Sequence, residues 1–231
     1  MELLCNGMTL EISPGAFPLS TDSMVLSHFV HLPPKARVLD LGSGCATLGI
    51  LLCAGNDLCR VTGIEIEESA HNQALKNIEA NHLSHRLQSI CRDLRQLPPE
   101  FTGRFDCCVS NPPYFTGGPA SSRTPLARRD DNCSPDQLFT AAAQALKYGG
   151  DFFLVHKPER LAQLIALGSQ ASLEAKRLLL VRHRSDGPVS LICLQLRKGA
   201  KPGLKIEELS LRGADGAFTD SYRQIYHMQE G

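Results

Sequence analysis

Residues 109–115, VSNPPYF, bring an amide side chain, two consecutive prolines and two aromatic rings into one short stretch. Each proline fixes its own φ and lacks a backbone N–H, so the stretch predicts a rigid elbow rather than the interior of a strand or helix. The side-chain oxygen of Asn111 and the carbonyl of Pro112 are acceptors whose relative angle the prolines would hold. Tyr114 adds a ring that can stack on a planar group.

Two fixed acceptors suit an amino group attached to a heteroaromatic ring. Such an amine is a poor nucleophile, because its lone pair is delocalised into the ring. Acceptors on its two N–H bonds draw the nitrogen toward a tetrahedral shape and aim the lone pair at a methyl donor. No strong base is required, since the proton becomes acidic once the methyl group has moved. We expect Asn111, Pro112 and Tyr114 to be catalytic; the alternative is a stiff turn with a packing tyrosine.

A second candidate site is the glycine turn of VLDLGSGCATLG, residues 38–49. Glycines between a strand and a helix allow a ligand to approach the backbone closely, although a plain turn would look similar. Gly42 and Gly44 match a dinucleotide fingerprint, but Thr47 replaces its third glycine. Asp40 would repel a pyrophosphate and attract an ammonium or sulfonium group. S-adenosylmethionine carries both cations, and we expect it to be the cofactor.

Further carboxylates follow the next two expected strands. Glu65 lies where an acid can accept both hydroxyls of a ribose, and Ile66 beside it is included among the expected cofactor contacts. Asp93 could reach an adenine amino group. The alternatives are a solvated strand end for Glu65, and for Asp93 an ion pair with Arg92 or Arg95.

Strands and helices alternate along the chain before a terminal hairpin. The apolar patterns predict strands at 36–41, 60–66, 86–91, 104–110 and 150–156, and helices at 45–55, 68–82, 134–150 and 158–169. Two more strand-like segments flank RSDGP, which has the Asp-Gly signal of a tight turn. This order predicts an α/β fold with a mainly parallel sheet and one antiparallel strand at its end.

The composition of the 231 residues sets limits on function. The formal net charge is zero, so no global field favours nucleic acid. No long apolar run or basic leader appears, and we expect a cytoplasmic protein without membrane contact. Nine cysteines, an odd number without a CxxC pair, predict reduced and mostly buried thiols rather than disulfides or a metal site.

Three motifs together resemble a known family. LDLGSGCATLG, GIEIEESA and SNPPYF look like a class I S-adenosylmethionine-dependent methyltransferase, and nearly the whole chain resembles the bacterial tRNA1(Val) (adenine-37-N6)-methyltransferases. The flanking segments FPLSTDSMVLSHFV, ARRDDNCSPDQLF and DGAFTDSYRQIY are part of that likeness. The resemblance implies a Rossmann-like α/β fold with a seven-stranded, mainly parallel sheet, a C-terminal antiparallel hairpin and helices on both faces.

The resemblance also implies roles and boundaries. A covering segment (1–35) would precede the methyltransferase core (36–200), with a packed extension at 201–231, and the chain would act on tRNA as a monomer. The implied cofactor contacts are Thr21, Asp22, Asp40, Gly42, Gly44, Glu65, Asp93 and Asn111. The implied clamp on the target base is Asn111, Pro112, Pro113 and Tyr114. Thr21 and Asp22 have an alternative role, since STD is also an ordinary start of a helix.

Basic residues after the elbow are candidates for RNA contact. The long stretch 115–133 carries Arg123, Arg128 and Arg129, which could bind phosphate, although Asp130 and Asp131 could neutralise two of them. A second basic group lies around residues 176–184, and its alternative interpretation is polar strand ends. An adenine in a tRNA loop could be splayed into the pocket. In the tail, the spacing of Tyr222 and Tyr226 favours packing over base stacking.

Other functions remain open from the sequence alone. Methylation of a protein glutamine would use the same clamp, but the enzymes concerned carry a helical domain before the core, and only about thirty-five residues precede the first expected strand. Enzymes acting on DNA adenine usually need a recognition domain, for which there is no room, and methylation of guanine in ribosomal RNA is a further alternative. A non-catalytic cofactor-binding module would be expected to lose the Asn-Pro-Pro-Tyr clamp.

Overall fold

The computed structural model describes residues 2–4, 7–12, 19–112 and 133–227. Pro113, Tyr114 and the arginines at 123, 128 and 129 therefore lie outside the described residues. The helices are α1 (Thr21–Phe29), α2 (Thr47–Gly55), α3 (Glu68–Ala80), α4 (Pro135–Ala145), α5 (Leu161–Gln170) and α6 (Asp220–Ile225). The strands are β1 (Glu2–Leu3), β2 (Thr9–Leu10), β3 (Arg37–Leu41), β4 (Arg60–Glu65), β5 (Leu87–Cys91), β6 (Phe105–Ser110), β7 (Leu146–His156), β8 (Leu173–Arg184), β9 (Val189–Lys198) and β10 (Lys205–Arg212). Short 3-10 helices cover Leu94–Gln96, Pro99–Phe101 and Pro158–Arg160.

The main sheet has eight strands in the order β10-β8-β9-β7-β6-β3-β4-β5. The expected mainly parallel sheet with a terminal hairpin is confirmed, and only β9 runs against its neighbours. The expected number of seven strands is wrong, because β10 adds a strand parallel to β8. The antiparallel strand is also not at the end of the sheet, since β9 returns between β7 and β8.

The eighth strand, β10, lies within the expected extension at 201–231, and its sequence, KIEELSLR, is highly charged. Its charges are matched across the pair with β8: Arg177 bonds Glu207 at 3.1 Å, and Arg182 lies 3.8 Å from Glu208. Charged side chains are common on edge strands, where they discourage pairing with another molecule. These ion pairs also identify the second basic group as polar strand residues.

Helix α4 begins as expected and ends earlier. Ser134 is its N-cap, with its backbone N–H donating to the Gln137 side chain at 3.0 Å in a capping box. The prediction that the helix continues to residue 150 is wrong, because β7 begins at Leu146 and pairs with Phe105. The glycines lie inside an irregular part of this strand: Gly149 has a φ of 79°, and a Cβ on Gly150 would be 3.0 Å from the Asp106 carbonyl.

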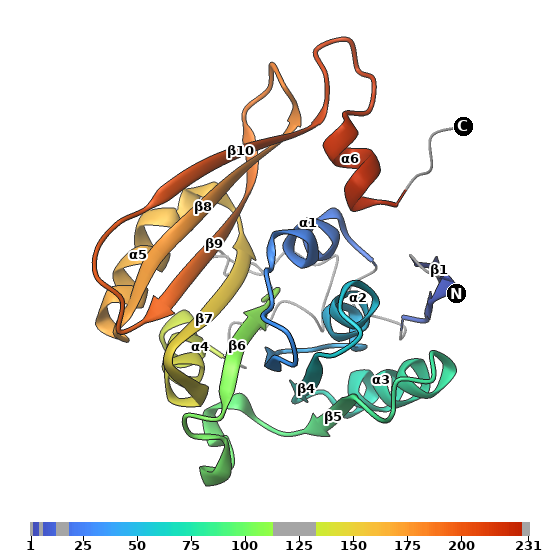
Figure 1. Cartoon of the computed structure of the whole chain (residues 1–231), viewed down its shortest axis with the longest axis vertical. Helices are drawn as coiled ribbons and strands as arrows, with labels where there is room; N and C mark the ends of the chain where they lie inside the picture. Colours follow the sequence, from blue (N-terminus) through green and yellow to red (C-terminus); the bar gives the residue numbers. More distant parts are fainter. Residues whose placement is uncertain (1, 5–6, 13–18, 113–132, 228–231) are drawn as a thin grey trace, which may run out of the picture.

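Helices cover both faces of the sheet (Figure 1). Helices α1, α2 and α3 contribute to one apolar core, together with residues such as Val38 of β3 and Val61 of β4. Helices α4 and α5 pack on the opposite face, where Leu39 and Ile64 meet Phe139. Consecutive residues of β3 thus enter different cores, which is the period-two alternation of a strand buried on both sides.

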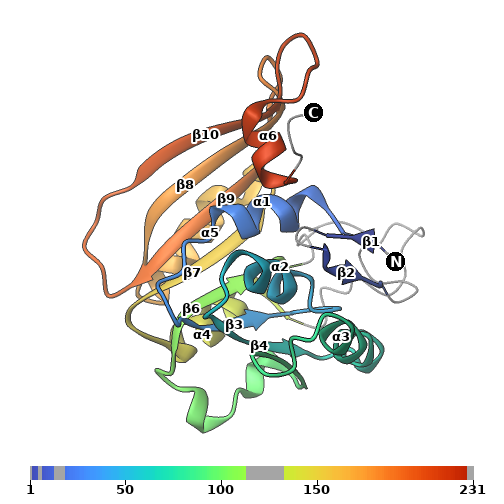
Figure 2. The same ribbon diagram turned by 45° about the vertical axis from the view of Figure 1, so that its right-hand side comes forward.

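The small β1–β2 hairpin lies beside α3 (Figure 2). Asn81 of α3's C-cap exchanges hydrogen bonds with the backbone of Thr9 at 2.7 and 2.8 Å. The buried amide of Asn77 bonds the backbone of Glu11 and donates to the carbonyl of Cys45 at 2.9 Å. Asn77 therefore ties the N-terminal segment to the glycine turn after β3.

Helix α6 and β10 bring the tail against α1. Thr219 caps α6 by accepting the backbone N–H of Tyr222 at 3.2 Å. The rings of Phe218, Tyr222 and Tyr226 stack with centroids 4.1 and 4.2 Å apart, and Arg212 covers the outer face of Phe218 at 3.8 Å. The tail aromatic rings thus pack on one another, as the sequence favours.

The packing of α5 on the sheet yields a first prediction. A Cβ on Gly168 would collide with Leu196 of β9 and lie 2.8 Å from the Leu173 carbonyl, whereas one on Gly55, at the end of α2, would meet no atom within 4 Å. We expect Gly168→Ala to lower the free energy of unfolding by about 1–3 kcal/mol. The matched control Gly55→Ala should be neutral or stabilising by up to about 1 kcal/mol. Urea unfolding measures both, and equal stability of the two variants would contradict this packing.

Candidate active site

Four adjacent parallel strands deliver the sequence-predicted residues to one edge of the sheet. The order β6-β3-β4-β5 is parallel throughout, so the loops that follow these strands start side by side. They carry Asn111 after β6, Gly42 and Gly44 after β3, Ile66 after β4, and Asp93 after β5. The carboxyl edge of an open α/β sheet is where ligands bind in this architecture.

The glycine turn after β3 adopts a conformation that side chains disfavour. Gly42 and Gly44 have φ values of 76° and 54°, in the left-handed region. The backbone N–H groups of Gly42 and Ser43 both donate to the Ile64 carbonyl at 3.0 Å, which holds the turn against the end of β4. The two glycines are thus brought beside Glu65, as the motif predicts.

Glu65 is buried and links two loops. Its Oε2 accepts the Gly44 N–H at 2.7 Å, and its Oε1 accepts the Glu67 N–H at 2.8 Å. The alternative of a solvated strand-end carboxylate is therefore wrong, since Glu65 is only 8% exposed. Each carboxylate oxygen has a second acceptor site, so Glu65 can still accept hydrogen bonds from a ligand.

Asp40 is the most unusual group at this edge. It is 1% exposed, and neither of its carboxylate oxygens has a hydrogen-bond partner among the described residues. Burial, and then the nearby Glu65, raise the pKa of Asp40 to about 8. The Gly49 N–H in the first turn of α2, which approaches the carboxylate without reaching hydrogen-bond geometry, offsets part of the rise. The buried Ser43 hydroxyl likewise has no partner within the described part of the chain. These unpartnered oxygens fit a cationic ligand group, because a positive charge beside Asp40 would favour its ionised form.

Ile66, after β4, and Asp93, after β5, differ in how free their side chains are to contact a ligand. Ile66 is 41% exposed and presents an apolar side chain next to Glu65. Asp93 forms an ion pair with Arg95, whose Nε donates at 2.8 Å, and this contact lowers the pKa of the Asp93 carboxyl. The ion-pair alternative for Asp93 is therefore present, and a role in binding the cofactor stays a prediction.

Asn111 extends from a well-anchored strand end. The Ser110 hydroxyl donates to the Leu41 carbonyl at 2.7 Å, which fastens the end of β6 to the end of β3. The side-chain nitrogen of Asn111 donates to the Ser23 hydroxyl of α1 at 2.9 Å. Pro112 is buried directly after it. The clamp is therefore next to the glycine turn, while its second proline and Tyr114 are outside the described residues.

Thr21 and Asp22 form the first turn of α1. Ser20 is the N-cap of this helix, so the ordinary helix-start role of STD is confirmed. The Thr21 hydroxyl accepts a hydrogen bond from Tyr226 at 3.1 Å, and both residues are half-buried. Contact of Thr21 or Asp22 with a cofactor stays a prediction.

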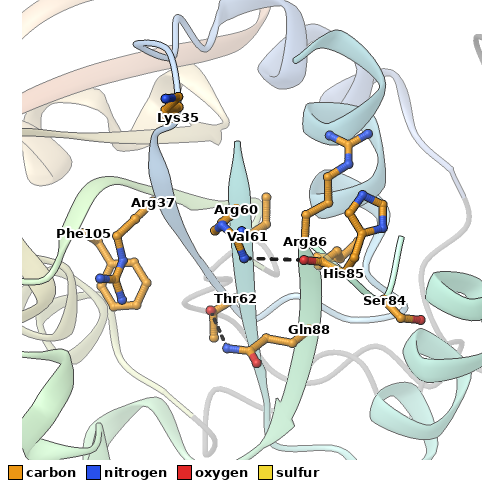
Figure 3. A pocket seen from close by; sticks show the side chains of 11 residues that line it. Lys35, Arg37, Arg60, Val61, Thr62, Ser84, His85, Arg86, Gln88 and Phe105 are labelled. Atoms are coloured by element: carbon orange, nitrogen blue, oxygen red, sulfur yellow. Dashed lines mark hydrogen bonds between the residues drawn. The ribbon is translucent and has the colours of Figure 1, made fainter. Parts of the chain in front are cut away.

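A cavity of about 520 Å³ lies at the opposite edge of the sheet (Figure 3). Its basic side chains are directed at separate partners. Arg37 lies 5.9 Å from the centre of the Phe105 ring, and Arg60 donates to a backbone carbonyl at 3.5 Å. Arg86 donates at 2.7 Å to a carbonyl just past the end of α2. These cations do not converge on one point, so we place the site at the carboxyl edge.

The described residues give little support to a metal site, a membrane-spanning helix or disulfide bonds. No group of three or more His, Cys, Asp or Glu side chains there could hold a metal ion. No helix in those residues is both long and apolar enough to cross a bilayer. The described cysteines are free thiols and mostly buried, as expected.

Sequence reasoning missed the residues that support the site from a distance. Ser23 contacts Asn111 across 88 positions, and Tyr226 contacts Thr21 across 205. Ser110 was read only as the end of a strand. A signal existed for Ser23, because it lies in the STDS segment already expected to cover the cofactor.

Comparisons with known proteins agree with this geometry. The family model described as methyltransferase small domain matches residues 20–168, more than half of the chain. A relative from Serratia proteamaculans, named tRNA1(Val) (adenine(37)-N6)-methyltransferase, is 27% identical over 91% of this chain and 82% of its own. A relative of the same name from Shewanella halifaxensis is 34% identical over 68% of this chain and 64% of its own.

Solved structures support the fold. A crystal structure described as a predicted O-methyltransferase from Agrobacterium tumefaciens has a TM-score of 0.75 at 18% identity, covering 90% of this chain and 96% of its own. A geranyl diphosphate C-methyltransferase from Streptomyces coelicolor, crystallised with S-adenosyl-L-homocysteine, has a TM-score of 0.59 at 10% identity over 76% of this chain and 79% of its own. With the glycine turn, Glu65 and Asn111 gathered at one sheet edge, the chain belongs to the methyltransferase small domain family.

Proposed function

We propose that the protein transfers a methyl group from S-adenosylmethionine to N6 of an adenine in tRNA, the adenine at position 37 of a valine tRNA. The observation that carries the proposal is the placement of the Asn111 amide beside the buried Asp40 and Glu65 at one edge of the sheet. The names of the relatives supply the nucleotide and the tRNA. We further propose that it acts in the cytoplasm and as a monomer.

The cofactor would be held by residues of three loops. When bound, S-adenosylmethionine supplies a methyl group on a positively charged sulfur. Asp40 and Ser43 offer oxygens without partners in the described structure, which suits a cationic part of the ligand. Glu65 retains acceptor capacity for ribose hydroxyls. Ile66 is exposed and apolar, as a contact to the adenine ring requires. Asp93 would have to share its oxygens between Arg95 and an adenine amino group.

The clamp would act on the amino group of the target base. The side-chain oxygen of Asn111 and the carbonyl of Pro112 accept hydrogen bonds from its two N–H groups. These bonds localise the nitrogen lone pair. That lone pair would form the new N–C bond with the methyl group that the bound cofactor supplies, the C–S electron pair would leave with the cofactor's sulfur, and the N6 proton would pass to water. Pro113 and Tyr114, outside the described residues, complete the proposed contact to the base.

The tRNA contact is proposed for the segment after the clamp. Arg123, Arg128 and Arg129 are outside the described residues and stay candidates for phosphate binding. The second basic group offers less free charge: Arg177 bonds Glu207, and Arg184 bonds Asp186 at 3.0 Å. These internal pairs favour the 115–133 segment as the RNA contact.

The substrate is tested by nucleoside mass spectrometry. Deleting the gene should remove N6-methyladenosine from purified valine tRNA, and re-expression of the wild-type protein should restore it. An unchanged tRNA nucleoside profile would contradict the proposed substrate. Loss of a methylated guanosine from ribosomal RNA, or of methylglutamine from a protein, would identify one of the alternative acceptors instead.

Asn111→Ala tests the clamp. Removing an acceptor that acts mainly in the transition state should lower turnover by roughly 100-fold or more. The affinity for S-adenosylmethionine, measured by calorimetry, should change little, because the cofactor's proposed contacts are mainly in the glycine turn, Glu65 and Ile66. Single-turnover assays measure the chemical step. Wild-type turnover in this variant would remove Asn111 from the mechanism.

Asp40 should make cofactor binding dependent on pH. The raised pKa of about 8 means that the free protein holds a proton on Asp40 at neutral pH. A bound cation favours the carboxylate, so binding should release this proton below pH 8. Affinity for S-adenosylmethionine should therefore rise by up to about ten-fold per pH unit up to pH 8 and then level off.

The matched control for this titration is Asp40→Asn. The amino group of the cofactor titrates in the same pH range, and the variant leaves that contribution unchanged. Calorimetry in buffers of different ionisation enthalpy counts the released protons. Equal proton release by wild type and Asp40→Asn would show that Asp40 does not face the cation.

A further inference from the structure

We infer that Ser23 is a positioning residue for the Asn111 amide; the inference rests on the proposed function. Ser23 lies in the first turn of α1 and is 6% exposed. Its hydroxyl accepts the side-chain N–H of Asn111 at 2.9 Å. Nothing in the motif around Asn111 indicates this contact, because the two residues are 88 positions apart.

The contact holds the amide with its oxygen directed away from α1. The terminal torsion of an asparagine side chain is broad, and its oxygen and nitrogen occupy nearly equal volumes. Only the oxygen can accept from a substrate amino group, whereas the nitrogen would place a donor against a donor. With Nδ2 bonded to Ser23, Oδ1 is directed away from α1, and no partner for it is recorded among the described residues. A serine hydroxyl can donate as well as accept, so Ser23 fixes the direction of the amide group rather than recognising its nitrogen, and it holds the amide in place before the substrate binds.

Ser23 can have this role because its own position is fixed. The N-cap hydroxyl of Ser20 accepts the Ser23 N–H at 3.4 Å. The buried face of α1 includes Val25, Leu26 and Phe29, and the Phe29 ring packs edge-on against Phe153 at 5.9 Å. Tyr226 bonds Thr21 in the same turn. The acceptor for Asn111 is thus held by a cap, a packed core and the tail.

The other side of the contact is equally constrained. The hydroxyl of Ser110 is bonded to β3, and Pro112 is buried immediately after Asn111. The backbone of Asn111 is therefore held on both sides, which leaves the side-chain torsions as its main freedom. A single hydrogen bond from α1 is enough to restrict them. This is a preorganisation effect, in which the acceptor is oriented before charge develops on the substrate nitrogen.

Ser23→Ala is the direct test, with in vitro-transcribed valine tRNA as the probe. We expect kcat to fall about ten-fold, because the loss of one hydrogen bond raises the activation free energy by an amount that corresponds to about that factor. The KM for tRNA and the Kd for S-adenosylmethionine should stay within about two-fold, because Ser23 contacts neither in the proposal. Ser23→Thr keeps the hydroxyl and should restore most of the lost kcat.

Ser27→Ala is the matched control in the same helix. The Ser27 hydroxyl bonds the Met24 carbonyl at 2.8 Å, one turn further along α1, and this variant should keep the wild-type kcat. The side-chain amide signals of Asn111 in a nitrogen-15 spectrum should shift in Ser23→Ala and not in Ser27→Ala. This readout reports the contact without tRNA.

The outcomes separate the two proposals. Wild-type kcat in Ser23→Ala, or an equal loss in Ser27→Ala, overturns the positioning role while the proposed function stands. Loss of kcat that Ser23→Thr does not restore also overturns it. If the wild-type protein methylates no adenine in tRNA, the proposed function fails, and the positioning role fails with it.

Discussion

The site depends on a carboxylate that the fold buries without a partner. Asp40 lies at the meeting of four parallel strand ends, beside a second acid, Glu65. A shift in pKa from 3.8 to about 8 corresponds to a cost to folding on the order of 6 kcal/mol when the group is ionised. Such a cost is retained where a ligand offsets it. Asp40 is 1% exposed, and the strand that carries it contributes to an apolar core on each face of the sheet.

Much of the fold could be predicted from the sequence, because the informative signals are local. The expected strands at 36–41, 60–66 and 86–91 end within one residue of β3, β4 and β5, since short apolar runs bounded by turn residues are typical of buried parallel strands. The errors arise where tertiary contacts override local signals. Gly149 and Gly150 are usual at a helix end, yet pairing of Leu146 with Phe105 places them in a strand. The charged strand β10 has no apolar pattern, and its partners lie about thirty positions away.

For the candidate site, too, the local signals could be predicted from the sequence and the contacts between distant segments could not. Asp40, Glu65 and Asn111 follow strands that could be recognised, and parallel pairing requires their loops to share an edge. What the sequence could not provide is the set of contacts between distant segments. The bond from Asn77 to the glycine turn and the bond from Ser23 to Asn111 need the folded chain. Whether the Asp93 oxygens are available to a ligand also depends on whether the Arg95 side chain turns toward them. The spacing of the two residues in the sequence leaves this open.

The stack of Phe218, Tyr222 and Tyr226 against Thr21 has a consequence for biosynthesis. Thr21 and Tyr226 are separated by 205 positions, and closing so long a loop carries an entropic cost that local contacts do not. While the ribosome is still translating, strands β3 to β6 can pair before the last helix has left the exit tunnel. The first turn of α1 acquires its tail contact only after residue 226 emerges. The nascent chain can therefore pair strands β3 to β6 before it secures the helix above the site.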